Sequence, residues 1–388
     1  MSASIPRNKE NDYTEEMAKN RRDFVSAQTR TTLKHLAQYS FEPSITAGNI
    51  ENFMGAVQVP LGLAGPLLVD GEHAKGEFYV PMATSEGTLV ASYNRGMRLL
   101  REAGGVKVSV VDDAMQRAPV FIFSDAREAR EFGQWINANF PDIQAAAESS
   151  TKSGKLRNIE QYPAARMLYL RFNFTTGDAA GQNMVSKATY VACEWIKENY
   201  PKSLKYTLSG AMDTDKKHSQ LNTLHTRGKR VIAEATIPSK LLQSIMGVTA
   251  NALLKMRAIS QVGNFMAGSI NTGAHSANGI TAIFIATGQD VANVAESSAA
   301  VTYADMDDDD NYYIAITIPS LIVATYGGGT GLATQKECLE MLDCYGEGKV
   351  YKLAEIVGAT VLAGELSLSS AILAGDWVSS HDNYGRNR

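Results

Sequence analysis

The sequence has 388 residues, of which 44% are hydrophobic and 20% are charged. This composition is typical of a folded globular protein and excludes a disordered chain, and the length predicts two or three compact units. Lys and Arg number 37 and Asp and Glu 41, which gives a formal net charge of −4. This slightly acidic balance excludes a general nucleic-acid-binding protein, because that function needs an excess of cations to neutralise phosphates.

The cysteines and the apolar segments indicate a cytoplasmic protein with no membrane partner. Cys193, Cys338 and Cys344 are odd in number and lack zinc-site spacing, so we expect reduced core thiols and no bound metal. The apolar stretch 280–286, taken as the longest in the chain, is about a third of the ~20 residues that a membrane-spanning helix needs. The N-terminal MSASIPRNKENDYTEE lacks the apolar core of a signal peptide.

The N-terminal part of the chain is expected to contain two helices separated by turns. Apolar residues recur at helical spacing over 16–39. Residues 51–71 are rich in Gly and Pro and have apolar runs too short for helices, which predicts turns and strand edges. A second helix is predicted over 84–103, opened by a Thr or Ser cap with Glu86 in its first turn.

The segment 119–208 has a different, modular pattern. Its strand and helix signals alternate in the order strand, helix, strand, strand, helix, strand. The strands are expected at 119–123, 155–160, 166–174 and 205–209, and the helices from 126 to 136 and from 183 to 199. This order predicts a ferredoxin-like split βαβ arrangement. Because both flanking regions are helix-rich, the segment is interpreted as an insertion into a larger domain.

After Lys216 the chain is expected to be mainly helical. The exceptions are a strand over 280–288 and a hairpin arm over 311–319. The acidic run 305–310 is interpreted as a solvated turn, since Asp residues without spaced partners hold metals poorly. A final helix is predicted over 351–374.

The common nucleotide-binding fingerprints are missing. No Walker A sequence is present, and TYGGGTGLAT has Thr334 where the third glycine of GxGxxG would stand. A different phosphate-binding geometry is predicted after the strand at 166–174, where a small-residue turn leads into a helix. Asp178 and Asn183 in this turn are candidates to fix a ribose or an amide, with a helix cap as the alternative role of Asp178.

Two loops place ionisable groups next to small or apolar residues. Lys216 and Lys217 follow Asp215 in a loop, where they form either a solvated surface or, in a cleft, cations that stabilise an oxyanion. Glu86 lies near apolar residues, and burial there would raise its pKa above the usual ~4.3 and make it a proton donor. Asp290 directly follows the strand predicted at 280–288.

The C-terminal tail contains a single histidine, His381, among glycine and serine residues. A tail of this composition has the mobility to act as a flap over a site. An isolated tail histidine is usually inert, so its weight depends on the other candidate residues.

Several motifs follow one another in a fixed order from about residue 48 to 382: ENFMG, VPLGLAGPL, VPMATSEGTLVAS, GDAAGQNM, TDKK, MAGSI, AHSAN, TAIFIATGQD, TYGGGTGL, GTVLAGELSL and SSH. Together they resemble the 3-hydroxy-3-methylglutaryl-CoA (HMG-CoA) reductase family, in a class I-like catalytic portion without a membrane anchor. The resemblance implies the two-step, four-electron reduction of HMG-CoA to mevalonate and CoA by two NADPH, in isoprenoid biosynthesis.

The resemblance also implies a division of catalytic roles. Lys216 would polarise the thioester carbonyl and stabilise the oxyanion, and Glu86 would protonate the aldehyde oxygen in the second reduction. Asp290 would lie between them and tune both, while His381 would protonate the departing CoA thiolate.

Binding residues are implied in the same way. The acyl carboxylate would be bound by Arg117 with Ser209, Asp215 and Lys217. The CoA moiety would lie near Ser92, Asn94 and Arg95, although Arg95 is equally well interpreted as a helix-surface charge. The dinucleotide would contact Thr151, Lys152, Asp178, Asn183, Ser186 and, from the tail, Arg386.

The implied architecture is an α+β fold. It comprises a helical N-terminal region (1–50), a large helix-rich substrate- and CoA-binding domain (51–116 and 221–388), a ferredoxin-like NAD(P)-binding insert (117–208) and a catalytic-lysine loop (209–220). The active site would form between subunits, so at least a homodimer is expected.

Several positions depart from the family pattern. The family's DAMGMNM is DAAGQNM here, and Thr151 and Lys152 replace a Ser-Arg pair for the NADPH 2′-phosphate, so NADH stays open as an alternative cofactor. A family lysine that helps to hold the substrate carboxylate falls on Ile259, and SGNYCTDKK has become SGAMDTDKK, which adds Asp213. Two alternatives therefore remain: a paralogous reductase of another acyl thioester, bound to CoA or a carrier protein, and a catalytically inactive homologue that binds CoA esters.

Overall fold

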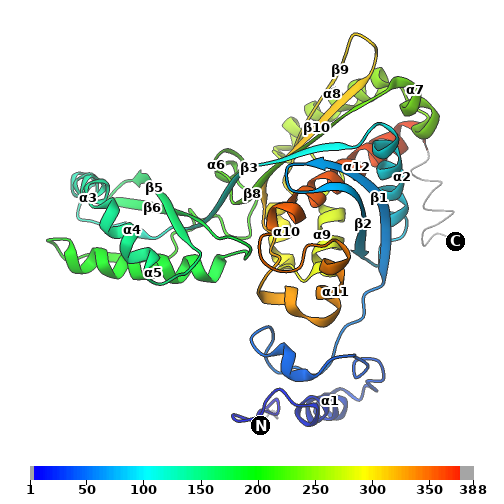
Figure 1. The fold of residues 1–388 in the computed structure, drawn as a ribbon. Helices are drawn as coiled ribbons and strands as arrows, with labels where there is room; N and C mark the ends of the chain where they lie inside the picture. Colours follow the sequence, from blue (N-terminus) through cyan, green and yellow to red (C-terminus); the bar gives the residue numbers. More distant parts are fainter. Residues whose placement is uncertain (1–3, 376–388) are drawn as a thin grey trace.

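The structure, a computed structural model, describes residues 4–375. Figure 1 shows an N-terminal segment, a large central body and an elongated lobe projecting from the body. Helix α1 (Glu15–Thr29) and the 3₁₀ turn η1 (Pro43–Thr46) belong to the N-terminal segment. Helix α1 ends ten residues before the expected position 39, because Arg30 adopts a left-handed conformation (φ 57°) that stops the helix.

The central body is built on a mixed, mainly antiparallel sheet. Its strands follow the order β2-β1-β3-β8-β10-β9, with only the β1–β3 pair parallel. They are β1 (Leu61–Gly71), β2 (Lys75–Ala83), β3 (Val106–Arg117), β8 (Gly228–Ile237), β9 (Val301–Met306) and β10 (Tyr312–Leu321). Residues 307–311 connect β9 to β10, and Asp307 to Asp310 are exposed there, as the sequence predicted, whereas Asp305 lies in strand β9 and not in the turn.

Helix α12 (Val350–Ala374) runs through the core of the body and packs on α2 (Leu89–Glu102), α9 (Ser276–Thr287) and the sheet. It is long and apolar enough to cross a membrane, but 83% of its most apolar window is buried, which is typical of the core helix of a globular domain. The stretch 280–286 is therefore not the longest apolar segment, as the sequence analysis took it to be.

The remaining helices of the body include the long α8, which lies beside β9. They are α6 (Gln220–His225), α7 (Ser239–Leu241), η2 (Leu242–Met246), α8 (Ala250–Ala267), η3 (Val291–Asn293), α10 (Val294–Ser297), η4 (Gly328–Gly331) and α11 (Ala333–Met341).

Three predictions about the body were wrong. The region after Lys216 was expected to be mainly helical, but it also contains strands β8 and β9, which were not predicted. The segment 280–288 was expected to be a strand, but it belongs to helix α9, which ends where Gly288 takes a left-handed conformation (φ 70°). Because α9 is buried on nearly all sides, its apolar run carries no helical period to distinguish it from a core strand. Helix α2 begins at Leu89, so Glu86 lies in the preceding turn and not in the first helical turn.

The projecting lobe has its own hydrophobic core, centred on buried side chains such as Phe121, Phe132, Phe172 and Ile196. Its strands follow the order β7-β4-β6-β5, and every pair is antiparallel. The elements are β4 (Val120–Ile122), α3 (Ala126–Ala138), α4 (Phe140–Glu148), β5 (Lys155–Ala164), β6 (Met167–Thr175), α5 (Gln182–Asn199) and β7 (Lys205–Thr207). Strand β3 links lobe and body by pairing with β6 as well as β8.

Candidate active site

The loop after β7 presents Lys216 under backbone strain. Ala211, Thr214 and Lys216 all take left-handed conformations, with φ of 68°, 53° and 56°. A non-glycine residue in this region costs on the order of 1–3 kcal/mol and persists only where surrounding contacts enforce it. Three such residues within six positions mark this loop as a candidate functional segment.

Lys216 forms an ion pair with Asp290. Lys216 Nζ lies 3.0 Å from Asp290 Oδ2, and the two side chains are 43% and 42% exposed. Asp290 also accepts a 3.1 Å hydrogen bond from the backbone N–H of Ala292, which holds its carboxylate at the start of η3. An accessible, oriented cation of this kind can stabilise negative charge developing on a bound carbonyl oxygen.

A buried network lies beneath this pair. Arg227 is fully buried and donates to Glu296 Oε2 (2.9 Å) and Asp215 Oδ1 (2.5 Å). Gln182, at the start of α5, donates to Asp215 Oδ1 and to the Asn293 side-chain oxygen. These bonds tie the lysine loop to both the projecting lobe and the body.

Arg117, at the end of β3, pairs with the acid that the sequence analysis identified as an addition to the loop. Arg117 Nη1 lies 2.7 Å from Asp213 Oδ2 and 3.9 Å from Asp215 Oδ2. Ser209 also donates to Asp213 Oδ2 (3.1 Å), and Lys217 Nζ donates to the backbone carbonyl of Asp215. The predicted carboxylate-binding residues therefore lie together, and Asp213 is bonded to two of them.

Glu86 lies apart from the Lys216 loop and contacts helix α9. Its two carboxylate oxygens accept hydrogen bonds from Asn278 Nδ2 at 3.1 and 2.8 Å. Glu86 is exposed and is not buried among its apolar sequence neighbours. Next to it, His275 is buried against the Tyr93 ring, and this burial lowers the pKa of the imidazole.

Helix α9 separates the two groups of acids and bases. Asn278, which holds Glu86, is in its first turn, and Asp290, which pairs with Lys216, follows its C-terminal Gly288. At 1.5 Å per residue, the helix axis from Asn278 to Thr287 is about 13 Å long. A single chain therefore places Glu86 and Lys216 at opposite ends of a helix.

A pocket of about 370 Å³ lies at the Asp290 end, between the lobe and the body. The small-residue turn 179–181, the first turn of α5 with Asn183, and the glycine-rich segment 327–329 line it together with Asp290. Asn293 also lines the pocket, and its side-chain nitrogen is buried without a hydrogen-bond partner in the described part of the chain. An unsatisfied donor beside small residues and a helix N-terminus is suited to a polar, phosphate-bearing ligand.

The Asp178 side chain is hydrogen-bonded to the protein backbone and is therefore not free to bind a ligand. Its carboxylate accepts hydrogen bonds from the backbone N–H groups of Gly348, Lys349 and Val350, and so it caps α12. The capping alternative thus describes this side chain, although the capped helix is α12 and not the adjacent α5.

The other predicted site residues are placed as follows. Ser92 Oγ and Arg95 bond Ser367 of α12, and Asn94 accepts from the Gly65 N–H. In the lobe, Thr151 accepts from the Gly154 N–H, Ser186 bonds the Gln182 carbonyl, and Lys152 is exposed. His381 and Arg386 lie outside the described residues.

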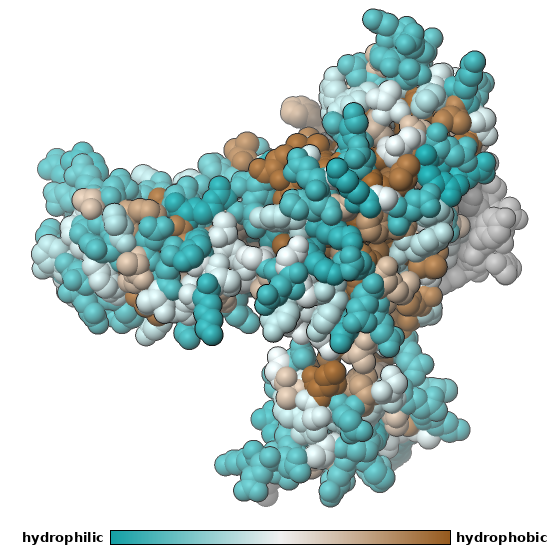
Figure 2. Space-filling model, in the orientation of Figure 1, coloured by the Kyte–Doolittle hydropathy of each residue, from teal (hydrophilic) through white to brown (hydrophobic). Residues whose placement is uncertain are grey.

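Ile259 lies on the exposed face of α8 and is 71% exposed. Val262, Phe265 and Met266 on the same helix are also exposed, and together the four form an apolar α8 face. Figure 2 shows apolar surface on the large body in this region.

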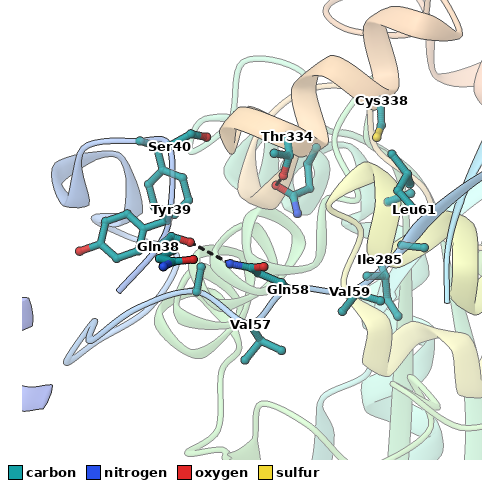
Figure 3. Close-up of a pocket in the computed structure, with 15 residues that line it drawn as sticks. Gln38, Tyr39, Ser40, Val57, Gln58, Val59, Leu61, Ile285, Thr334 and Cys338 are labelled. Carbon is teal, nitrogen blue, oxygen red and sulfur yellow. Dashed lines mark hydrogen bonds between the residues drawn. The ribbon is translucent and has the colours of Figure 1, made fainter. Parts of the chain in front are cut away.

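A larger cavity, of different lining, lies between the N-terminal segment and helices α9 and α11. It measures about 610 Å³, and Figure 3 shows Tyr39, Val57, Ile285 and Cys338 among its lining side chains. It contains none of the predicted site residues. One group of the described residues, Glu72, His73 and Glu355, has metal-ligand spacing, but Glu355 already accepts three backbone N–H bonds from the β1–β2 turn.

Sequence reasoning missed Asn278, Arg227 and Glu296. Asn278 stands in the quoted AHSAN motif, so its position was visible although no role was assigned. Arg227 and Glu296 carry no local signal, because their importance arises from contacts with distant parts of the chain.

The chain is similar to known proteins over nearly its whole length. The family model of hydroxymethylglutaryl-coenzyme A reductase matches residues 17–386. The chain is 44% identical over 373 residues to 3-hydroxy-3-methylglutaryl-coenzyme A reductase of Methanocaldococcus jannaschii, covering 94% of this chain and 92% of that protein. It is likewise 44% identical over 375 residues to the enzyme of Methanothermobacter thermautotrophicus, covering 96% and 94%. Among solved structures, the class II 3-hydroxy-3-methylglutaryl-CoA reductase of Streptococcus pneumoniae, bound to NADPH in open conformations, matches with a TM-score of 0.69 at 19% identity, over 90% of this chain and 82% of that one. At this identity the structural match shows a shared fold.

Proposed function

The chain belongs to the hydroxymethylglutaryl-coenzyme A reductase family, and we propose that it reduces HMG-CoA to mevalonate and free CoA in isoprenoid biosynthesis. The observation that carries this proposal is the accessible Lys216–Asp290 pair at the edge of the small-residue pocket. The two reductions consume four electrons, and NADPH supplies a hydride in each. NADH remains the alternative donor, because Lys152 offers a phosphate a point charge and no bidentate fork.

The pocket beside Asp290 fits such a dinucleotide. Asn183, at the helix N-terminus, and the unpaired side-chain nitrogen of Asn293 would hold its polar groups. Contacts from the lobe and the tail are proposed for Thr151, Lys152, Ser186 and Arg386. Asp178 contributes by fixing the pocket wall to α12. The projecting lobe, residues 117–208, is then the cofactor domain, and its strand order β7-β4-β6-β5 supports the ferredoxin-like interpretation.

Each candidate catalytic or binding residue has a distinct task in the proposed mechanism. The Lys216 ammonium polarises the thioester carbonyl and stabilises the oxyanion formed there, and Asp290 holds that ammonium in place. His381 protonates the CoA thiolate as the C–S bond breaks, and Glu86 protonates the aldehyde oxygen in the second reduction. Arg117, Ser209, Asp215 and Lys217 bind the acyl end, and Ser92, Asn94 and Arg95 lie near CoA.

Two copies of the chain would complete each site. Helix α9 holds Glu86 and Lys216 apart within one chain, so Glu86 of one subunit is proposed to meet Lys216 of another. The exposed apolar α8 face offers surface for such an interface.

Mixing inactive variants tests this shared site. E86Q and K216A chains, mixed after dissociation, should form heterodimers with one intact site, restoring about a quarter of wild-type activity when subunits pair at random in a symmetric dimer. No recovery in a mixture shown to contain heterodimers would place Glu86 and Lys216 in the same subunit.

The reaction is tested by following NADPH and NADH oxidation with HMG-CoA together with thiol release. Two cofactors oxidised per thiol are expected for a four-electron reduction. The inactive-homologue alternative predicts that CoA esters raise Tm without turnover.

A second substrate is favoured by one observation. Arg117 already pairs with the buried Asp213, and Ile259 supplies no charge, so the acyl-binding end is less cationic than the family pattern. A CoA or carrier-protein thioester without a distal carboxylate is therefore the second candidate. A higher kcat/KM for such a thioester than for HMG-CoA would favour it.

A further inference from the structure

Glu296 is a fully buried carboxylate that the proposed mechanism does not use. It lies in α10, directly after η3, and both of its oxygens have partners. Oε1 accepts the backbone N–H of Lys216 at 3.1 Å, and Oε2 accepts Arg227 Nε at 2.9 Å and Asn222 Nδ2 at 3.5 Å.

The segment that contains Glu296 therefore contacts Lys216 at both ends. Asp290 contacts its ammonium, and Glu296, six residues later, contacts its backbone N–H. Because η3 and α10 are consecutive, these two acids form one continuous clamp around a single lysine.

The backbone of Lys216 needs such a contact. Its φ of 56° is unfavourable for a side chain with a Cβ, and in the unfolded chain nothing enforces it. Glu296 accepts a hydrogen bond from the backbone N–H of this strained residue. It also accepts one from Arg227, which in turn donates to the side chain of Asp215, the residue before Lys216.

We propose that Glu296 is a positioning residue that sets the location of the Lys216 ammonium in both reductions. The proposal rests on the function proposed above, in which Lys216 stabilises the oxyanion. A displacement of about 1 Å in a catalytic group can lower a rate up to about a hundredfold, so the loss of the Glu296 contact should affect kcat.

A graded series of substitutions tests the proposal. E296Q keeps the length of the side chain but offers one acceptor to two donors, Lys216 N–H and Arg227 Nε–H, whereas E296A removes both bonds. Glu355→Gln is the matched control, because Glu355 is equally buried and accepts three backbone N–H groups at the β1–β2 turn.

The expected result is a graded loss of kcat. In E296A, kcat should fall about 10- to 100-fold for HMG-CoA and by the same factor for mevaldehyde, with an intermediate loss in E296Q. The KM for NADPH should stay within about twofold, because the contacts of Glu296 lie on the lysine loop and its supports. E355Q should keep wild-type kcat.

A second readout is independent of turnover. Trypsin cleavage after Lys216 or Lys217, followed by mass spectrometry under native conditions, should accelerate at least about fivefold in E296A and not in E355Q. If the wild type reduces no thioester, the proposed function fails, but this cleavage still tests whether Glu296 holds the loop. A folded E296A or, if that variant unfolds, a folded E296Q with unchanged kcat and unchanged cleavage would overturn the proposal.

Discussion

Arg117 and Asp213 form an ion pair at 2.7 Å, with side chains only 14% and 3% exposed. Removing Asp213 would leave the buried charge of Arg117 without its nearest partner. Asp215, at 3.9 Å, would compensate part of that charge. The pair therefore links stability to substrate preference, because the guanidinium that would bind a substrate carboxylate is already bonded to a side chain of the protein.

The D213N variant should release Arg117 for the substrate. We expect the KM for HMG-CoA to fall about tenfold, while the free energy of unfolding drops by about 1–3 kcal/mol. D112N is the control, since Asp112 forms a more exposed ion pair with Arg157 near the start of the projecting lobe, and its effect should stay below about 1 kcal/mol. An unchanged KM in folded D213N would show that Asp213 does not compete with the substrate.

Replacing Ile259 by lysine should restore a charge at the substrate end. Because Ile259 is 71% exposed in the single chain, I259K should change the free energy of unfolding of an isolated subunit by less than about 0.5 kcal/mol. A new charged hydrogen bond to the carboxylate should lower the KM for HMG-CoA about 10- to 100-fold. I259Q, which is polar but uncharged, separates charge from polarity. Equal KM values for both variants would place position 259 away from the carboxylate.

Local patterns predicted the projecting lobe well but parts of the body poorly. The expected strands at 155–160 and 166–174 correspond to β5 and β6, because their alternation and bounding turns are local signals. Strand β8 was missed although Val231, Ala233, Ala235 and Ile237 alternate inward, since the whole region after Lys216 was interpreted as helical. The prediction for helix α9 was wrong for a different reason. Because this helix is buried on nearly all sides, its sequence lacks the periodic alternation of apolar and polar residues that distinguishes a helix from a core strand.

The site was predictable only where motifs are contiguous. Asp215, Lys216 and Lys217 were identified as adjacent residues, and in the structure Asp290 pairs with Lys216. Glu296 could not be predicted, because it lies 80 residues from Lys216 and its role depends on a backbone N–H that any residue would have.

Replacing His381 by glutamine should separate the two reductions. The thiolate leaves only in the first, so H381Q should cripple HMG-CoA reduction and spare mevaldehyde reduction, because the aldehyde has no thiol to protonate. Both rates are measured by NADPH oxidation. Equal losses with the two substrates would refute the assigned role.

Gly96 determines how closely α2 approaches α12. A Cβ at this position would lie 1.9 Å from the backbone carbonyl oxygen of Ala363, and a backbone atom cannot rotate away. We therefore expect G96A to lower the free energy of unfolding by about 2–3 kcal/mol. Gly263, in α8, has open space around its Cβ position, so G263A should instead be neutral or add up to about 1 kcal/mol. Urea denaturation of both variants checks this, and equal effects would show that the helix contact relaxes.

Glu296 should make stability depend on pH. Burial raises its pKa to about 7 from a usual value of 4.5, against the opposing charge of Arg227 and with a smaller contribution from Asp215. The folded state then holds this proton more strongly than the unfolded state between pH 4.5 and 7, so the free energy of unfolding falls as pH rises through that window, by up to about 3 kcal/mol. E296Q lacks the titration, and its stability should therefore gain on that of the wild type between pH 5 and 7. Urea denaturation at several pH values measures the difference in the free energy of unfolding between E296Q and the wild type. Other titrating groups such as Glu365 and His275 are present in both proteins, so their contributions cancel in this difference. A difference that stays constant over the window would mean that Glu296 remains ionised in the folded protein.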